Sequence, residues 1–186
     1  MNDAPGLAPV NVSSTRVSVR GVEEGDIDDL LEVNGDPEVT RFLPYPTWQS
    51  RDDGLAWLKR MRGLEETGGC RQLVVVRNGD GKVIGTVLLF RFDAGSARAE
   101  LGFVLGQAHW GQGFMREALE AVCAHAFSAM SIRRLEAEVN PANEPSNGLL
   151  RRIGFRLEGT LRKRWMAKGV PYDTNFYGFL AEEWHS

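Results

Sequence analysis

A strand, a pair of glycines and an amphipathic helix follow one another directly between Glu100 and Met130. The apolar segment ELGFVL is typical of a buried strand, and Gly111-Gln112-Gly113 comes shortly after it. Apolar side chains then recur at helical spacing; they are Leu119, Val122, Cys123, Ala126, Phe127 and Met130. This order predicts α/β structure in which the chain turns sharply from a strand into a helix.

The glycines before this helix have two interpretations. They form either a plain tight turn or a site for an anion, because the first amides of a helix lack internal partners and carry partial positive charge. Glycine also lets the backbone approach a ligand closely. No Gly-Lys-Ser/Thr sequence follows, and the spacing is too short for a dinucleotide-binding fingerprint. We therefore favour a pyrophosphate held by backbone amides, without a metal.

The rest of the chain predicts a mixed α/β fold around one central sheet. Strands are expected at residues 15–22, 71–77, 82–92, 97–105, 133–140, 155–168 and 172–180, and helices at 25–36, 50–63, 114–130 and 143–154. Asp26 is a candidate N-cap, and Ser50 with Asp53 has the spacing of a capping box. Residues 37–48 are expected to be a loop, and residues 169–171 a turn between the two closing strands.

Length and composition indicate one soluble globular domain. The chain has 186 residues, of which 42% are hydrophobic and 25% charged. We expect a flexible tail at residues 1–14 and a single domain at residues 15–186. The net charge of −3 argues against a general nucleic-acid binder, which usually carries a basic face.

Cysteine usage and the apolar runs predict a cytoplasmic protein. Cys70 and Cys123 have no metal-ligand or disulfide-framework spacing, so two free thiols in a reducing compartment are expected. The longest apolar runs are too short to span a bilayer, and residues 1–14 do not resemble a signal peptide. We therefore expect no membrane partner and no metal site.

Four stretches carry a resemblance to a known family. The segments DPEVTRFLPYPTW, WGQGFMREAL, NPANEPSNGLLRRIGFRLEGTLR and YDTNFYGFLAEEW resemble the GNAT N-acetyltransferases, in particular their RimJ/RimL branch. The resemblance extends from about Val17 to Trp184. It implies a GNAT fold with a twisted, mostly antiparallel sheet that splays at an acetyl-CoA site. It also implies acetyl transfer from acetyl-CoA to a primary amine in a ternary complex, with no metal.

The resemblance also assigns candidate cofactor contacts. The backbone around the glycines would hold the CoA pyrophosphate, and the end of the preceding strand would pair with the pantetheine arm, which Asn143 would also contact. Arg152 belongs to a basic group with Arg151 and residues 162–164 that either is a solvated face or attracts the CoA 3′-phosphate or an acidic peptide. The candidate contacts are Phe103, Val104, Leu105, His109, Trp110, Gly111, Gln112, Gly113, Phe114, Met115, Asn143 and Arg152. Ala108 departs from the family, which usually has Arg or Gln at that position.

Glu100 is the candidate general base. Strand alternation places it on one face with Gly102 and Val104, just before the expected CoA-pairing segment. The alternative is a solvated position at a sheet edge. Glu158 is a weaker candidate base, and Asp173 is expected to shape the closing turn.

Ser146 is the candidate partner of the leaving thiolate. Many members of the superfamily have Tyr where this chain has Leu150, whereas the RimJ/RimL branch resembles this chain in having Ser at position 146. The alternative is a helix-start serine that bonds only to the backbone. Tyr177 is a second candidate acid, and His109 is either a catalytic imidazole or a loop residue near the phosphates.

The acceptor site is expected between residues 37–48 and residues 162–173, across from the cofactor. By resemblance to the branch, the favoured acceptor is a protein N-terminal α-amino group, whose pKa lies near neutrality, so it needs little help from a base. The alternatives are a small amine, such as a polyamine or an aminoglycoside, and a CoA-binding regulatory module without turnover. Both a monomer and a homodimer are compatible with the sequence.

Overall fold

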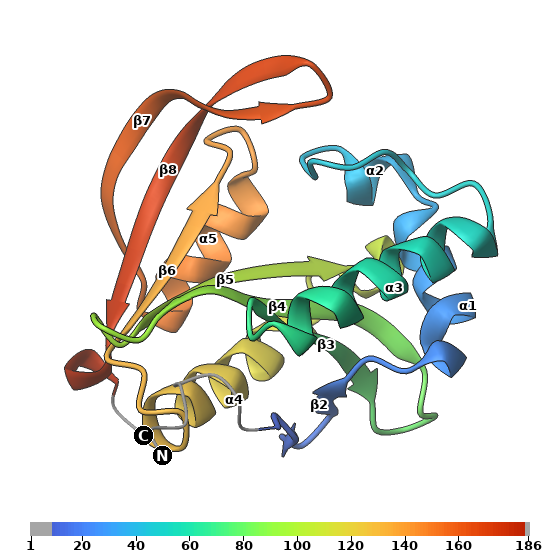
Figure 1. Cartoon of the computed structure of the whole chain (residues 1–186), viewed down its shortest axis with the longest axis horizontal. Helices are drawn as coiled ribbons and strands as arrows, with labels where there is room; N and C mark the ends of the chain where they lie inside the picture. Colours follow the sequence, from blue (N-terminus) through green and yellow to red (C-terminus); the bar gives the residue numbers. More distant parts are fainter. Residues whose placement is uncertain (1–8, 185–186) are drawn as a thin grey trace.

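The computed structural model describes residues 9–184, which form one twisted sheet with helices on both faces (Figure 1). The sheet has eight strands in the order β1-β2-β3-β4-β5-β6-β8-β7. The strands are β1 (Val12–Ser13), β2 (Val17–Gly21), β3 (Cys70–Arg77), β4 (Val83–Asp93), β5 (Arg98–Leu105), β6 (Arg134–Val139), β7 (Arg156–Ala167) and β8 (Val170–Leu180). The helices are α1 (Ile27–Asn34), α2 (Pro37–Thr40), α3 (Arg51–Glu66), α4 (Phe114–Ser128) and α5 (Glu144–Ile153). The predicted mixed α/β class is confirmed.

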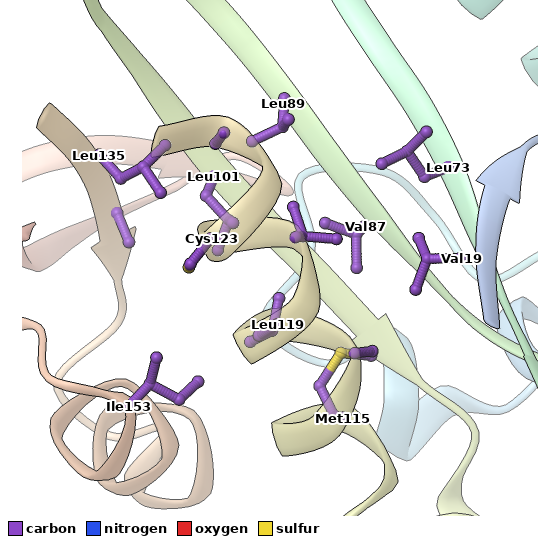
Figure 2. Close-up of a cluster of buried hydrophobic side chains, with 14 of the residues drawn as sticks. Val19, Leu73, Val87, Leu89, Leu101, Met115, Leu119, Cys123, Leu135 and Ile153 are labelled. Carbon is purple, nitrogen blue, oxygen red and sulfur yellow. The ribbon is translucent and has the colours of Figure 1, made fainter. Parts of the chain in front are cut away.

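Two apolar clusters hold the helices to opposite faces of the sheet. Strand β3 contributes to both, because its side chains alternate: Leu73 and Val75 join the cluster that includes α4, whereas Val74 and Val76 join the cluster of α1 and α3. Figure 2 shows the first cluster, in which the apolar stripe of α4 packs against the middle strands. The helical spacing of apolar side chains at residues 119–130 is therefore explained by their contact with this face of the sheet.

The sheet is antiparallel everywhere except between β5 and β6, and there it opens. These two strands pair over only three residues, the last pair being Glu100 with Glu136. Beyond this pair, β5 continues along β4 as far as Leu105, and β6 continues along β8 as far as Val139. Backbone groups that face the gap therefore have no partner in the neighbouring strand. The splayed sheet implied by the GNAT resemblance is confirmed.

Several local expectations need correction. Val12 and Ser13, which were expected to belong to the tail at residues 1–14, pair with β2; residues 1–8 lie outside the described chain. The expected loop at 37–48 begins with the short helix α2, which has Pro at its first turn, where a missing N–H costs nothing. The turn between the closing strands is Lys168-Gly169, because both residues have positive φ, and Pro171 already belongs to β8.

Asp26 does not act as the expected N-cap. It ends a short 3-10 helix, Glu24–Asp26, that leads into α1. Its carboxylate accepts a hydrogen bond from the backbone N–H of Glu23 at 2.8 Å and pairs with Arg20 at 2.8 Å. The Ser50 and Asp53 pairing is present, since the Asp53 carboxylate accepts from the Ser50 N–H at 3.0 Å. Within residues 9–184, no helix is long and apolar enough to cross a membrane.

Candidate active site

A cavity of about 330 Å³ lies where β5 and β6 part. Its walls include β5 from Glu100 to Val104 and the end of β6, followed by the start of α5. Five residues expected from the sequence to form the site come together in it; they are Glu100, Phe103, Val104, Asn143 and Ser146. The opening of the sheet therefore produces the cavity, because two diverging strands leave a space that side chains only line.

The opposite side of the cavity is made by the two segments expected to form the acceptor site. Residues 41–45 follow α2, and Trp165, Tyr172 and Asp173 come from the β7–β8 hairpin; all of them line the cavity. The Lys168 ammonium, at the hairpin turn, donates to the Thr40 carbonyl at 2.9 Å. Segments more than one hundred residues apart thus meet over the cavity (Figure 1).

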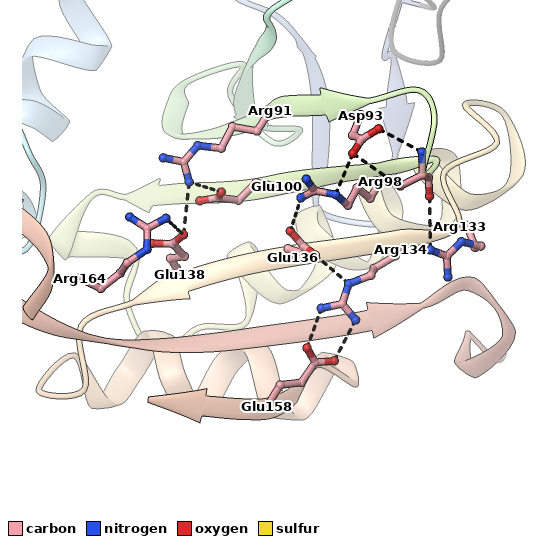
Figure 3. A network of polar contacts seen from close by, with 11 residues as sticks. Arg91, Asp93, Arg98, Glu100, Arg133, Arg134, Glu136, Glu138, Glu158 and Arg164 are labelled. Carbon is pink, nitrogen blue, oxygen red and sulfur yellow. Dashed lines mark hydrogen bonds and ion pairs between the residues drawn. The ribbon is translucent and has the colours of Figure 1, made fainter. Parts of the chain in front are cut away.

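Glu100 is buried in the middle of the sheet, so the alternative interpretation, a solvated position at a sheet edge, is wrong. Only 7% of the residue is exposed. Its Oε2 lies 2.6 Å from Arg91 Nη1 (Figure 3). Burial is the main cause that raises the pKa of Glu100; Arg91 opposes it, and the charges of Glu138 and Glu136 add to it. A carboxyl group with a raised pKa in a cavity is a candidate acid or base.

Arg91 joins Glu100 to a second carboxylate, Glu138, that was not predicted from the sequence. The same Nη1 lies 3.3 Å from Glu138 Oε1, and Arg164 also approaches that oxygen at 3.2 Å (Figure 3). Arg91 has φ of 51°, where the register of β4 and β5 shifts. A non-glycine residue there is strained, so the surrounding structure must hold it. The alternation of Arg134–Val139 is the only sequence signal that puts Glu136 and Glu138 on one face.

Ser146 and Asn143 lie together at the start of α5. Asn143 is the N-cap, and its Oδ1 accepts from the Ser146 N–H at 3.3 Å. Both residues line the cavity. This placement is compatible with the roles expected from the sequence, in which Ser146 contacts the leaving thiolate and Asn143 contacts the pantetheine arm. Within residues 9–184, the Ser146 hydroxyl makes no hydrogen bond, so it is available to a ligand.

Tyr177 occupies a structural position instead of a catalytic one. It is completely buried, it does not line the cavity, and its hydroxyl donates to Asn147 Oδ1 at 2.8 Å. Asn147 also accepts from Asn175 at 2.8 Å and donates to the carbonyls of Asn140 and Asn143. This buried amide, which sequence analysis did not predict, therefore ties α5 to the end of β6 and to the middle of β8.

Glu158 does not line the cavity, and Asp173 bonds to the backbone of the hairpin. Glu158 is exposed beyond the gap and forms a bidentate ion pair with Arg134, which lowers the pKa of its carboxyl group. Asp173 accepts from the backbone N–H of Lys163 at 2.9 Å, across the hairpin, as expected of a residue that shapes the closing turn.

The glycine loop has the geometry that only glycine adopts easily. Gly111 and Gly113 have φ of 71° and 84°, and α4 begins at Phe114, directly after them. Arg16 holds this loop from the start of β2: its Nη1 donates to the Gln112 carbonyl at 3.0 Å, and its guanidinium stacks 4.8 Å from the centre of the Phe114 ring. The amides of residues 111–115 thus lie at the positive end of α4, as an anion site requires.

The remaining candidates lie outside the cavity. Trp110 closes the end of β5, because its indole N–H donates to the Leu105 carbonyl at 2.8 Å. His109 packs edge-on against Phe114, and burial is the main cause that lowers its pKa. Arg152 lies in the last turn of α5 and lines a separate groove with Arg116. This placement gives His109 no catalytic position, and the proposed cofactor contacts of these residues remain predictions.

A gap between two central strands beside a glycine-opened helix is the arrangement that the GNAT resemblance implies. The chain matches the acetyltransferase (GNAT) domain family over residues 16–156. It therefore belongs to the GNAT family and is an N-acetyltransferase, so the CoA-binding module without turnover is set aside.

Individual relatives support the same assignment. The chain is 31% identical over 169 residues to an uncharacterized N-acetyltransferase, p20, of Bacillus licheniformis, covering 91% of this chain and 95% of that protein. It is 27% identical to the ribosomal-protein-serine acetyltransferase of Escherichia coli, covering 91% and 95%. The crystal structure of RimL, a ribosomal L7/L12 α-N-protein acetyltransferase in complex with coenzyme A, has the same fold, with a TM-score of 0.82 at 21% identity over 92% of this chain and 98% of that one.

Proposed function

We propose that this acetyltransferase transfers the acetyl group of acetyl-CoA to the α-amino group at a protein N-terminus. The observation that carries the proposal is the cavity at the strand gap, which has Glu100 and Ser146 in its walls and the two acceptor segments across from them. The ribosomal-protein-serine acetyltransferase and RimL, among the related proteins, act on proteins according to their names. A small amine remains the second candidate acceptor.

In the proposed reaction the amine nitrogen attacks the thioester carbonyl carbon, the carbon–sulfur bond breaks and an amide forms. The nitrogen loses a proton, which Glu100 takes directly or through water, and the departing thiolate gains one. A backbone N–H of β5 near Val104 polarises the carbonyl, and the Ser146 hydroxyl donates a hydrogen bond to the sulfur. Holding both substrates in one cavity supplies the remaining acceleration.

The residues at the start of α4 fit the phosphates of acetyl-CoA. Two glycines with positive φ leave the helix amides open to an anion, and a Cβ at Gly111 would meet nothing within 4 Å. Arg152 lies in the groove beside α4 and α5 and forms no ion pair among the described residues, so it is suited to a further phosphate, whereas Arg116 in the same groove pairs with Glu120. The strand edges at the gap would hold the pantetheine arm through backbone hydrogen bonds.

The test is an acceptor screen read by mass spectrometry and by release of free thiol. Peptides with free N-termini, the same peptides with blocked N-termini, polyamines and aminoglycosides are each incubated with acetyl-CoA and the protein. We expect acetylation of free N-termini only. Acetylation confined to the small amines would replace the proposed acceptor, and acetyl-CoA that neither binds nor raises the melting temperature would refute the cofactor site.

A further inference from the structure

The carboxylates at the strand gap are already neutralised by arginines. Arg91 lies 2.6 Å from Glu100 and 3.3 Å from Glu138, and Arg164 adds a second contact to Glu138. One carboxylate oxygen, Glu138 Oε2, is buried without a hydrogen-bond partner among residues 9–184. That oxygen has almost no exposed surface, so it offers little for a ligand in the cavity to bind.

The other end of the cavity carries positive charge instead. Arg41, after α2, and Arg60, on α3, both line it, and neither forms an ion pair within the described chain. The third carboxylate of the lining, Asp173, is already occupied by the backbone N–H of Lys163. Among the described residues, both guanidinium groups and the Asp173 carboxylate lack a partner of opposite charge, so unpaired arginines outnumber unpaired carboxylates at the cavity.

Aromatic side chains line the same cavity as these arginines. The cavity is lined by Phe42, Tyr45, Trp57, Phe90, Phe103, Trp165 and Tyr172. The Arg41 guanidinium carbon lies 5.2 Å from the centre of the Phe42 ring, and the Tyr45 hydroxyl donates to Asn34 at 3.0 Å. Arg41 and Arg60 are themselves exposed to solvent, so their attraction for an anion is strengthened only where the anion itself lies against the apolar walls and loses contact with water.

We propose that Arg41 and Arg60 bind a carboxylate of the acceptor, so that the preferred substrate is a primary amine with a carboxylate a short distance from it. The inference rests on the proposed acetyl transfer and names the acceptor class. Arginine suits this role because its planar fork binds a carboxylate through two hydrogen bonds. Polyamines and aminoglycosides are poor acceptors, since their further cations would meet two unpaired arginines and only one unpaired carboxylate, Asp173.

Two sources supply this chemistry, and the experiment separates them. One is an acidic side chain near the N-terminus of a peptide, and the other is the α-carboxylate of a free amino acid. The probes are three peptides that begin Ser-Glu, Ser-Gln or Ser-Lys and are otherwise identical, free glutamate and spermidine. Initial rates are measured with saturating acetyl-CoA for the wild type, Arg41→Gln, Arg60→Gln and the matched control Arg62→Gln, because Arg62 is exposed on α3 and does not line the cavity.

We expect the wild type and Arg62→Gln to use the Ser-Glu peptide at least tenfold better, in kcat/KM, than the Ser-Lys peptide. Arg41→Gln and Arg60→Gln should each reduce this preference at least threefold, mainly through a higher KM for the acidic peptide. A preference for free glutamate over all peptides would assign the carboxylate to an amino acid. Equal use of the three peptides by the wild type, or a preference that survives both substitutions, would overturn this inference and leave acetyl transfer intact. Acetyl-CoA binding without turnover on any probe would overturn the proposed function and this inference with it.

Discussion

Arg16, at the start of the described domain, forms an ion pair with Glu117 in the first turn of α4. The guanidinium also donates to the Gln112 carbonyl, and the Glu117 carboxylate accepts from the Ser14 hydroxyl at 2.7 Å. One cation thus connects the N-terminal strands, the glycine loop and the helix start. The pair holds the loop from outside, and within the loop the Gln112 side chain donates to the Ala108 carbonyl at 2.8 Å.

Replacement of Arg16 is therefore expected to weaken cofactor binding more than folding. Arg16→Met removes the hydrogen bond to the Gln112 carbonyl, and the loop then samples conformations that do not bind phosphate. We expect the Kd for CoA to rise about fivefold to tenfold, which corresponds to about 1 kcal/mol. Calorimetric titration measures it, with Lys59→Gln on the exposed face of α3 as the control. An unchanged Kd would assign Arg16 to folding alone.

Gly113 has a conformation that tests the phosphate site directly. Its φ is 84°, and a Cβ would lie 3.0 Å from an Arg16 nitrogen, so Gly113→Val strains the backbone and displaces the Arg16 guanidinium. We expect CoA affinity to fall at least tenfold, about 1.4 kcal/mol, in a protein that still folds. Gly63→Ala, at an open position within α3, is the matched control. Wild-type affinity in a folded Gly113→Val protein would return these glycines to a plain turn.

Tyr177 separates a structural hydroxyl from a catalytic one. Tyr177→Phe deletes the donor to Asn147 and leaves that buried amide with Asn175 as its remaining donor. We expect a loss of about 1 kcal/mol in the free energy of unfolding, measured by urea denaturation, with kcat within twofold of the wild type. A large fall in kcat at unchanged stability would give the hydroxyl a catalytic role after all.

Ser146 is expected to show the opposite pattern. Ser146→Ala removes a hydroxyl that has no protein partner within the described chain, so stability should change little. We expect kcat to fall several-fold while the Kd for acetyl-CoA changes less, because the hydrogen bond to sulfur gains strength as the thiolate forms. The two constants are measured on the same preparation. Wild-type kcat would assign protonation of the leaving group to water.

The sequence predicted the elements well because their signals are local. The alternation of residues 71–77 and 82–92 around Asn78–Gly81, and the helical spacing of residues 114–130, need only a few neighbouring side chains. The opening of the sheet after Glu100 was predictable only from the resemblance to the GNAT family. Strand register between residues more than thirty positions apart leaves no local pattern in the sequence. The short helix at Pro37 was missed because a three-proline segment also fits a loop.

The charged part of the site was predictable only in part. Glu100 was found because a carboxylate inside an apolar strand is unusual. Its partner Arg91 and the nearby Glu138 were missed, because their contact joins residues 47 positions apart through a bulge that no turn residue marks. The structural role of Asn147 was not predicted for a related reason, because its four hydrogen bonds depend on how α5 packs against β6 and β8.

Glu100→Gln tests the proposed base. Burial raises the pKa of Glu100, so the wild-type rate should increase as pH rises through that pKa and the carboxyl group becomes able to accept a proton. A general base typically contributes ~100- to 10,000-fold, so we expect the turnover of Glu100→Gln to fall at least tenfold, with unchanged CoA affinity. The deficit should shrink at high pH, where free amine is present without help. The pH–rate profiles of both proteins, recorded with one acceptor, measure this.

Stability provides the control for the same variant. A carboxyl group whose pKa is raised by folding stabilises the fold below its unfolded pKa, and that contribution is lost as pH rises through the folded pKa. Above the folded pKa the ionised Glu100 therefore costs stability, although Arg91 offsets part of this cost. In the Glu100→Gln variant Arg91 still has Glu138 as a partner. We expect the melting temperature of Glu100→Gln at pH 7 to equal or exceed that of the wild type, so a lower rate cannot come from unfolding. Superimposable pH–rate profiles would remove Glu100 from the mechanism and leave proximity of the two substrates to explain the rate.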